Sequence, residues 1–545
     1  MKRIYQIPIL LVLLFSVATA QTMIRTNAEL SNALLLGGDY QLAAGNYELA
    51  SALTLSQSLK LVGESPETTQ ISFLAGPSSL TGEEAIDLHF ENLGFVYTGE
   101  QSGDIFNLGA GSFHFENCSF SGAKFIEPED EDAIWYGDAI YLFGNAQGTI
   151  SASTFYNNGL AGIQADGDSV LEIKDSSFNQ NNIAIAAFGN STVTVLNSVI
   201  ENHSSEQAAV AAYGTATLNI QENQFRNNQT NALYVYENAE VEASANLFET
   251  NGTEDSDAVF LDDSVVGTFT NNEFLNNPRI ALTVSDTARA LISQNTFEGN
   301  GSADGYAAIT LEMDATASLT ENILRKNTGG AISVLDNAEG TLSNNTFTEN
   351  MTWTSLYLES NSKLNMTGNL IESSEGDAIY LTDQAELISE SDSFINNGEF
   401  GIRLVTQARA TISGGTFEGN RSGIILGDNS YASITGNTFR NNDRSGIGFL
   451  GNSDGFARNN LIEGHPRSGI AAAGTSSASI EQNQLNTNTY GILLAESTTA
   501  TANSNSLTAN DYGIYVVDGA TPNIGDNSFS NNQEDLAEGL EPSYE

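Results

Sequence analysis

A short motif, Asn-x-apolar-x-x-Asn, recurs along almost the whole chain and limits its folds more than any other feature. Aligning the sequence on this motif gives nineteen units over 434 residues, and most units are 22 to 24 residues long. A fixed period of this length is typical of a solenoid, in which each unit forms one turn and stacks on the next. The aligned apolar residues are Phe95, Phe120, Phe155, Phe178, Val199, Phe225, Phe248, Phe274, Phe297, Leu324, Phe347, Ile371, Phe394, Phe417, Phe439, Ile462, Leu485, Leu507 and Phe529.

Two kinds of solenoid fit this period. The segment "LNIQENQF" (218–225) also satisfies the central part of a leucine-rich repeat. A leucine-rich repeat continues with a helix or an extended arc, whereas this chain continues with "NNQTN" and then "ALYVY", a second run of strand formers. Three short strands per unit predict an all-β fold, a single-stranded right-handed parallel β-helix with three sheets. Its nineteen rungs would form a rod about 90 Å long at the usual strand spacing of ~4.8 Å.

The asparagine and the phenylalanine of each unit have distinct predicted roles. The asparagine falls at a corner, where stacked side-chain amides can bond along the rod and where the backbone must turn left-handed, which Asn tolerates. The ring behind it points inward and stacks on its neighbours. This pattern is clearest at Phe225, Phe248, Phe274, Phe297, Phe347 and Phe439. His465 replaces the corner asparagine of its rung, and we expect it to be a hydrogen-bonding substitute.

The first hundred residues support the same fold. The segment "TNAELSNALLLGGDYQLAAGNYELASALTLSQSLKLVGE" (26–64), with "HFENLGF" and "HFENCSFSG" further on, resembles the pectate-lyase-like superfamily of right-handed β-helices, in particular its general parallel β-helix repeat proteins. The resemblance covers nearly the whole chain and implies a short N-terminal helix that closes the open end of the rod. Asn27 would cap that helix and Gly37 would end it, with one apolar face formed by Leu30, Ala33 and Leu34.

The N-terminus has the pattern of a secretion signal. Lys2 and Arg3 precede an apolar run from Ile7 to Val17, and Ala18-Thr19-Ala20 follows as a cleavage site. We therefore expect a secreted, periplasmic or cell-surface protein that is a monomer. The expected division is a signal peptide at 1–20, an N-terminal cap with the first strands at 21–75, the β-helix at 76–533 and an acidic C-terminal tail at 534–545.

Charge and composition exclude several classes of partner. The chain has 68 acidic residues against 19 basic ones and a formal net charge of -49, which repels nucleic acid and anionic lipid. No later stretch approaches the ~18 apolar residues of a membrane-spanning helix, so membrane insertion is not expected. The single cysteine, Cys118, excludes an intramolecular disulfide, and four histidines without paired spacing leave little material for a zinc site.

Long loops and aromatic residues gather on one predicted sheet. Insertions at 121–137, 202–208, 251–257 and 300–306 precede the strand of the form G-I-x-L, and the outward positions of that strand are rich in aromatic residues and acids. Such a strip fits a polysaccharide, because rings stack on sugar C–H faces while acids bind hydroxyl groups. The alternative is that β-sheets favour aromatic residues and that loops or a partner cover them. The predicted binding residues are Tyr141, Phe143, Phe188, Tyr213, Tyr234, Tyr236, Phe260, Tyr357 and Tyr380.

Catalytic residues are only weakly indicated. Glu312 and Glu359 would lie two rungs apart, about 9.6 Å along the axis, near the upper limit for an inverting pair of carboxylates. Arg403, one rung from Tyr380, could neutralise a uronate carboxylate in a lyase reaction. The Gly-His-Gly and Arg-Ile-Lys segments of polygalacturonase-like relatives are absent. If the protein is an enzyme, a polysaccharide lyase is therefore favoured over a glycoside hydrolase.

Two further groups could bind ions. Asp257 and Asp262 could approach one calcium ion, although a solvated acidic loop is the favoured explanation. The segment "RSGI" recurs every 23 residues, at Arg421, Arg444 and Arg467. These guanidinium groups would repel on consecutive rungs unless a bound sulfate or uronate, or nearby acids such as Glu418, Asp443 and Glu463, offset their charge.

The sequence thus predicts a secreted β-helix that binds extracellular polysaccharide and, if it is an enzyme, also processes it. One alternative is a non-catalytic structural or adhesive rod of the cell envelope, whose regular faces contact other envelope proteins. A second alternative is a lyase that acts on a uronate polymer. No cofactor is indicated apart from calcium.

Overall fold

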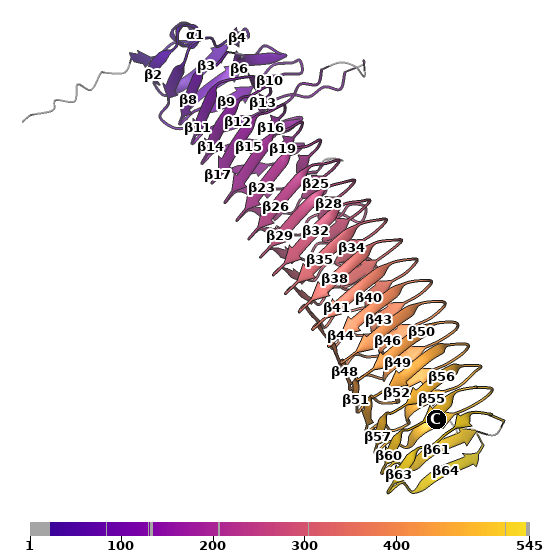
Figure 1. Cartoon of the computed structure of the whole chain (residues 1–545). Helices are drawn as coiled ribbons and strands as arrows, with labels where there is room; N and C mark the ends of the chain where they lie inside the picture. The colour runs from indigo at the N-terminus through magenta and orange to yellow at the C-terminus, as the bar shows by residue number, and fades with distance from the viewer. Residues whose placement is uncertain are drawn as a thin grey trace, which may run out of the picture.

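The chain forms a long, gently curved rod of stacked turns (Figure 1). The computed structural model describes residues 22–82, 84–128, 130, 134–204, 208–303, 305–517 and 519–540. Each turn contributes one short strand to each of three parallel sheets, and every described strand pairs with the equivalent strand of the turn before or after it. The predicted all-β, three-sheet solenoid is therefore confirmed.

The turns follow one order throughout. The first complete turn contains β2 (Gly38–Leu42) in sheet A, β3 (Gly45–Leu49) in sheet B and β4 (Leu53–Thr54) in sheet C. Within the described residues sheet A has 22 strands and sheets B and C have 21 each. The nineteen aligned units are a small undercount, because the first two turns place Tyr47 and Ile71 in register with Phe95 without the asparagine motif.

The ends of the rod differ from the expected boundaries. Strand β64 (Glu534–Gly539) pairs with β61 (Tyr512–Val517), so the solenoid continues past 533 into part of the predicted tail. Residues 1–20, the predicted signal peptide, lie outside the described residues. In the part of the chain that the structure describes, no helix is long and apolar enough to cross a membrane.

A single helix closes the N-terminal end of the rod. Helix α1 (Asn27–Leu36) ends at Gly37 and buries Leu30, Ala33 and Leu34, as predicted. Its cap is Thr26 rather than Asn27, because the Thr26 side chain accepts from the Glu29 N–H while Glu29 accepts from the Thr26 N–H. Asn27 instead accepts a hydrogen bond from the Glu48 N–H, 3.1 Å away, and ties the helix to β3.

Stacked phenylalanines form much of the core. In sheet B, Phe225, Phe248, Phe274 and Phe297 lie on consecutive turns with ring centroids 4.5 to 4.8 Å apart and nearly parallel planes. All four side chains are fully buried. This spacing equals the rise per turn, so each ring contacts the next along the axis and the predicted inward position of the motif is confirmed.

Buried asparagines form ladders at two corners. Between sheets A and B, Asn272, Asn295, Asn322 and Asn345 each donate from Nδ2 to the Oδ1 of the next turn, over 2.9 to 3.1 Å. Each also bonds the backbone of neighbouring turns, as in the 2.9 Å bond from Asn322 Nδ2 to the Ile292 carbonyl. A second ladder between sheets B and C includes Asn158 and Asn181. These ladders satisfy polar groups that the corners would otherwise bury unpaired.

The left-handed residue of the first corner is not the ladder asparagine. The positive φ angles fall one residue earlier, on Glu222, Ala245, Asn271 and Gln294, with values of 55° to 58°. The prediction assigned both tasks to one residue. The structure separates them, because the ladder asparagine must point its amide into the corner while its predecessor turns the chain.

His465 takes an asparagine position in the second ladder, as predicted. Its Nδ1 lies 3.2 Å from the Asn442 nitrogen, and its own N–H donates to Asn488 Oδ1 over 3.0 Å. The side chain is 1% exposed. Burial lowers the pKa of His465 to about 4, despite opposing bonds to the backbone of Asn442 and Phe439.

Candidate functional site

The predicted aromatic residues do lie on the outer face of sheet C, but in two patches instead of one strip. The first patch runs from β13 (Ile140–Leu142) to β28 (Val259–Leu261), and the second follows β40 (Thr354–Leu358) and β43 (Asp377–Leu381). The register places one turn above another throughout. The first patch contains Tyr141, Phe143, Phe188, Tyr213, Tyr234, Tyr236 and Phe260, and the second contains Tyr357 and Tyr380.

Small buried residues separate the two patches. Thr283, Thr310 and Ser333 continue the same column of sheet C and are each 9% exposed or less. The Arg279 guanidinium pairs with Asp257 and lies 4.3 Å from the centre of the Tyr306 ring. The Thr283 hydroxyl also donates to Asp257 over 2.7 Å. A polar cluster therefore interrupts the aromatic surface.

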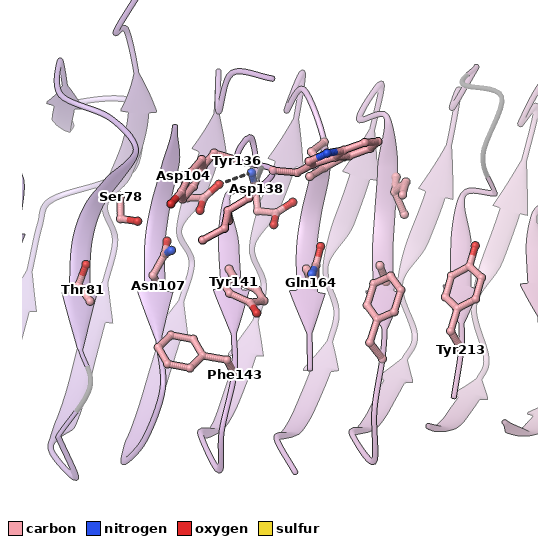
Figure 2. A pocket seen from close by; sticks show the side chains of 16 residues that line it. Ser78, Thr81, Asp104, Asn107, Tyr136, Asp138, Tyr141, Phe143, Gln164 and Tyr213 are labelled. Atoms are coloured by element: carbon pink, nitrogen blue, oxygen red, sulfur yellow. Dashed lines mark hydrogen bonds between the residues drawn. The ribbon is translucent and has the colours of Figure 1, made fainter. Parts of the chain in front are cut away.

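A cavity of about 830 Å³ opens on sheet C at the N-terminal end of the first patch. Figure 2 shows Asn107, Tyr141 and Gln164 on successive strands, with Asp104 and Asp138 along one edge and Tyr213 at the far end. Its described lining includes no lysine or arginine. The lining residues are Ser78, Thr81, Asp104, Asn107, Ile134, Trp135, Tyr136, Asp138, Tyr141, Phe143, Leu160, Gln164, Ile183, Ala186, Phe188 and Tyr213.

Small side chains of sheet C lie beside two stacked rings at this cavity. Sheet C has Ala186 on β19 (Ile183–Ala187) and Ala211 on β22 (Val210–Ala212) between Gln164 and Tyr234 in the same column. Beside them Phe188 and Tyr213 stack with centroids 5.0 Å apart and planes 8° apart. Two aligned rings next to a floor of methyl groups make an apolar wall suited to a flat ligand.

The long loop before β13 supplies a second aromatic side of this cavity. Trp135 and Tyr136 both line it, so this loop lies over part of the sheet. Trp135 also contacts Phe125, with ring centroids 5.2 Å apart, although 46% of its surface stays exposed. Much of this ring is therefore available to a ligand.

Two buried carboxyl groups form the polar edge of the cavity. Asp104 Oδ1 accepts from the Gly137 and Asp138 N–H groups at 2.6 and 2.9 Å, and Asp138 Oδ1 accepts from the Ala161 N–H at 2.8 Å. Burial raises the pKa of Asp104 to about 6, although these N–H groups oppose the shift. Burial, followed by the Asp104 charge, raises the pKa of Asp138 well above its usual range.

An aspartate in this position has a structural task elsewhere in the rod. Asp377, at the start of β43, accepts from the Phe400 N–H of the next turn at 3.0 Å. Burial raises its pKa to about 6 as well, again against the Phe400 bond. Asp104, Asp138 and Asp377 therefore make the same kind of hydrogen bond to the backbone of the next turn. Two of these three carboxyl groups lie at the edge of the cavity.

Asn107, beside Asp104, is a buried polar residue whose hydrogen bonds are only partly satisfied. Its side chain hydrogen-bonds Asp104 and is only 8% exposed. Its Oδ1 atom has no hydrogen-bond partner among the described residues. A buried amide oxygen without a partner is costly, and a ligand hydroxyl group in the cavity would satisfy it.

The second patch is smaller and carries one cation. Trp353 packs edge-on against Tyr380 with centroids 5.0 Å apart, and Tyr357 stacks on Tyr380 at 6.0 Å. Arg403 lies 5.3 Å from the Tyr380 ring centre and 3.9 Å from an Asp377 oxygen. A hollow of about 450 Å³ adjoins this group. Arg403 is thus beside the aromatic rings, as predicted, but it already has a carboxylate neighbour.

Glu312 and Glu359 occupy the predicted column two turns apart, following β34 (Ile309–Leu311) and β40, with Leu335 between them. Burial raises the pKa of Glu312, against a hydrogen bond with Ser285. Glu359 Oε2 accepts from the Tyr357 hydroxyl at 2.5 Å. The two carboxylates thus face different neighbours, and their role as a catalytic pair stays a prediction.

The two aspartates predicted to bind calcium also have separate partners. Asp257 pairs with Arg279 and Thr283, whereas Asp262 Oδ2 lies 3.5 Å from the Tyr234 hydroxyl. Asp262 Oδ1 also accepts from the Asp263 N–H at 2.9 Å. The arginine already neutralises the charge of Asp257, which favours a structural role for that side chain.

Arg421, Arg444 and Arg467 do stack on consecutive turns. The Arg444 N–H donates to the Arg421 carbonyl at 2.8 Å, and the Arg467 N–H donates to the Arg444 carbonyl at 3.1 Å. The Arg421 guanidinium pairs with Glu399, which the sequence did not indicate. Glu463, one of the acids expected here, pairs with Arg440 at 2.8 Å. Anion binding by this column stays a prediction.

One cluster revises the view that the histidines have no useful spacing. His89 and His114 lie on adjacent strands of sheet A with ring centroids 4.7 Å apart, and Glu116 is beside them. The two histidines are 25 residues apart in the chain, which the stacking of turns converts into direct contact. This separation corresponds to one turn of the repeat, and that correspondence was the signal in the sequence for the pair.

Other site residues also escaped the sequence prediction. Asn107, Asp138, Gln164 and Ala186 were not identified, because polar or small residues on a strand face do not stand out from a single sequence. Trp353 was missed because it precedes its strand, at the tip of a loop. One signal was present in the sequence: two alanines, Ala186 and Ala211, follow one another in the column between Gln164 and Tyr234.

Several solved structures are similar to this chain at low sequence identity. Solved structures that are similar include the catalytic unit of a GH87 alpha-1,3-glucanase from Streptomyces thermodiastaticus strain HF3-3 (11% identity, 67% of this chain and 66% of that one, TM-score 0.37). A PL6 family alginate lyase (11%, 96% and 100%, 0.30) and the pre-mature gene product 12 of bacteriophage phi29 (10%, 91% and 70%, 0.42) are also similar. At these identities nothing about activity follows.

Among curated proteins, none matches the sequence. The family model described as "Right handed beta helix region" matches residues 104–255, 257–417 and 400–539, well over half of the chain. This match agrees with the right-handed β-helix expected from the repeat. The chain therefore belongs to the right-handed β-helix family.

Proposed function

We propose that this protein binds an uncharged, hydroxyl-rich polysaccharide outside the cytoplasm, with a sugar unit seated in the sheet C cavity. The observation that carries this proposal is the combination of aromatic sides and polar edge in one cavity of about 830 Å³. Phe188 and Tyr213 offer ring faces to sugar C–H groups, and Asn107 offers an unpaired amide oxygen to a hydroxyl group. The N-terminal signal pattern supports the location.

Charge favours a neutral glycan over an acidic one. The described lining has two buried aspartates and no basic residue, and the whole chain carries a net charge of -49. A uronate polymer would bring its carboxylates towards these acids without a cation to offset the repulsion. The binding site is also arranged as an open groove on a rod, which suits a long chain better than a free sugar.

A matched pair of variants tests the proposal. Tyr213→Ala is expected to weaken binding of a neutral polysaccharide about tenfold, because the ring contributes roughly 1.4 kcal/mol of stacking. Tyr512→Ala is the control: Tyr490 and Tyr512 form a similar stacked pair on sheet C, with centroids 5.3 Å apart, but lie outside the cavity. Affinity electrophoresis through gels containing neutral or acidic polysaccharides, each with both variants, measures the effect.

Two outcomes would contradict the proposal. One is equal retardation of the wild type and Tyr213→Ala in every neutral gel. The other is binding of acidic polysaccharides alone, which would shift attention to the basic column near Arg421. Thermal unfolding of both variants checks that any loss of affinity does not come from loss of the fold.

A lyase that acts on a uronate polymer is the second candidate, and the Arg403 group is the observation that favours it. Arg403 lies beside Tyr380, which stacks on Tyr357, and it lines a hollow of about 450 Å³. If this candidate is correct, incubation with alginate or pectate should produce the ultraviolet absorbance of an unsaturated product, and Arg403→Gln should abolish it. Absence of product with retained binding of neutral polysaccharide supports the first proposal.

A further inference from the structure

The outer face of sheet A carries a group of four potential metal ligands near the N-terminal end. Strand β8 (Asp87–Glu91) contains His89 and Glu91, and β11 (Ser112–Glu116) contains His114 and Glu116. The two strands pair in parallel with His89 opposite His114 and Glu91 opposite Glu116. Equivalent positions on paired parallel strands share one face, so all four side chains project from the same surface.

The ligand atoms of this group converge. His89 Nε2 lies 3.7 Å from Glu91 Oε2, and His114 Nε2 lies 3.6 Å from Glu116 Oε2. One ligand atom each from His89, His114 and Glu116 lies within 4.8 Å of the others. Tetrahedral coordination with bonds of ~2.0–2.2 Å needs ligand atoms about 3.4 Å apart, which small side-chain rotations would provide.

The two imidazoles are already oriented for such a role. His114 Nδ1 pairs with the hydroxyl of Thr149 on the next strand, which leaves Nε2 free to face the carboxylates. His89 Nε2 is buried yet has no hydrogen-bond partner among the described residues. A metal-binding histidine usually has an outer partner on its other ring nitrogen, as His114 has, and a metal ion would satisfy the buried nitrogen of His89.

We propose that His89 and His114, through Nε2, together with the carboxylate of Glu116, bind one divalent transition-metal ion of the zinc class. Two imidazoles and one carboxylate suit this class, whereas calcium takes oxygen ligands only. His89 and His114 line a hollow of about 550 Å³ together with Asp87, Ser112 and Thr149, and water or an external ligand in it would complete the coordination of the ion. The site joins two turns of the rod and is independent of the sheet C cavity.

Lys60 lies close to the proposed metal ligands, so replacing it tests the electrostatics of the site. Lys60 lies opposite His89 on β5 (Leu59–Val62), and its Nζ is 3.8 Å from Glu91 Oε2. Its positive charge opposes a bound cation and occupies Glu91, which is why Glu116 is the carboxylate ligand in this proposal. Lys60→Gln should therefore tighten zinc binding by about threefold.

Titration calorimetry of the full chain with zinc chloride, and separately with calcium chloride, tests the site. We expect one zinc ion per chain at this site, with affinity reduced at least about tenfold in each of His89→Ala, His114→Ala and Glu116→Gln. The matched controls are His203→Asn and His465→Asn, which change the other two histidines of the chain, both buried in the corner ladder. These should bind zinc like the wild type.

Nitrogen-15 spectra of the histidine rings add a readout that does not depend on affinity. Zinc should shift the Nε2 signals of two histidines and leave those of His203 and His465 unchanged. Zinc should also raise the melting temperature of the wild type but not of the His89→Ala, His114→Ala double variant. Zinc binding that persists undiminished in the double variant would show binding to surface carboxylates only and overturn the proposal, as would the absence of zinc binding by the wild type.

Discussion

Replacing Asn322 with alanine is expected to lower the free energy of unfolding of the surrounding turns by about 4 kcal/mol. Asn322 Oδ1 accepts from the Asn295 N–H and side-chain amide at 2.9 and 3.1 Å, and its Nδ2 donates to the Ile292 carbonyl. Alanine leaves the Asn295 N–H buried without a partner and removes the side-chain hydrogen bond to the Ile292 carbonyl. An unpaired buried group costs about 1–3 kcal/mol, and the second lost bond and a small cavity add to the loss.

Two other variants show whether the ladder causes this loss. Asn322→Ser should recover about half of it, because serine at position 198 of the same corner already accepts from the Ser176 N–H at 3.1 Å. Asn337→Ala removes an exposed asparagine that bonds Asp314, and it should cost less than about 0.5 kcal/mol. Thermal unfolding combined with hydrogen exchange suits this measurement, because a solenoid can open locally. Equal losses for Asn322→Ala and Asn337→Ala would contradict the ladder interpretation.

His465 should make the rod sensitive to acid. The pKa of His465 is about 4 in the folded protein and ~6.5 in the unfolded chain, because burial opposes the charged ring. Above pH 6.5 both states are neutral and the stability is complete. Between pH 6.5 and 4 only the unfolded chain binds the proton, so stability falls as the pH falls. The total loss is about 3 kcal/mol at pH 4, from ~1.4 kcal/mol per pH unit.

Restoring the asparagine should remove this sensitivity. His465→Asn is expected to unfold at nearly the wild-type temperature at pH 7 and several degrees higher at pH 4.5. Burial also lowers the pKa of His203, so the double variant with His203→Asn should widen the difference. Comparing variants at each pH cancels the titration of the many carboxylates. A constant difference between the proteins from pH 7 to 4.5 would refute the assignment.

The fold was predictable because its determinants repeat. Nineteen units show the same pattern of rings and asparagines, so an error in the assumed register would conflict with all of them. The inward rings and the corner asparagines are therefore strongly specified by the sequence. Features that occur only once in the chain were harder to predict. The cap of α1 moved from Asn27 to Thr26, since both are good capping residues and only the reciprocal bond with Glu29 decides between them.

The sequence predicted which face of the sheet carries the candidate sites, but not how far they extend along the rod. Alternation correctly placed Phe188 and Tyr213 on the outer face, because that needs only the period of a strand. The break between the two patches depends on loop residues such as Arg279, whose position over the sheet is not encoded in any strand pattern. Likewise, the separation of His89 and His114 indicates a contact only when it is compared with the number of residues in one turn.

The corner ladders give the rod a direction that its shape conceals. Along each described run, the amide nitrogen of one asparagine points to the following turn and its oxygen accepts from the preceding turn, as Asn272, Asn295 and Asn322 show. The amide dipoles therefore add head to tail, with the positive end towards the C-terminus, and polarise one another. At the last rung of the second ladder Asn532 accepts from Asn510 Nδ2 and donates to the Asp535 carboxylate over 3.0 Å. That ladder thus ends with a negative charge at its positive end, as a helix does with an acid at its N-terminus.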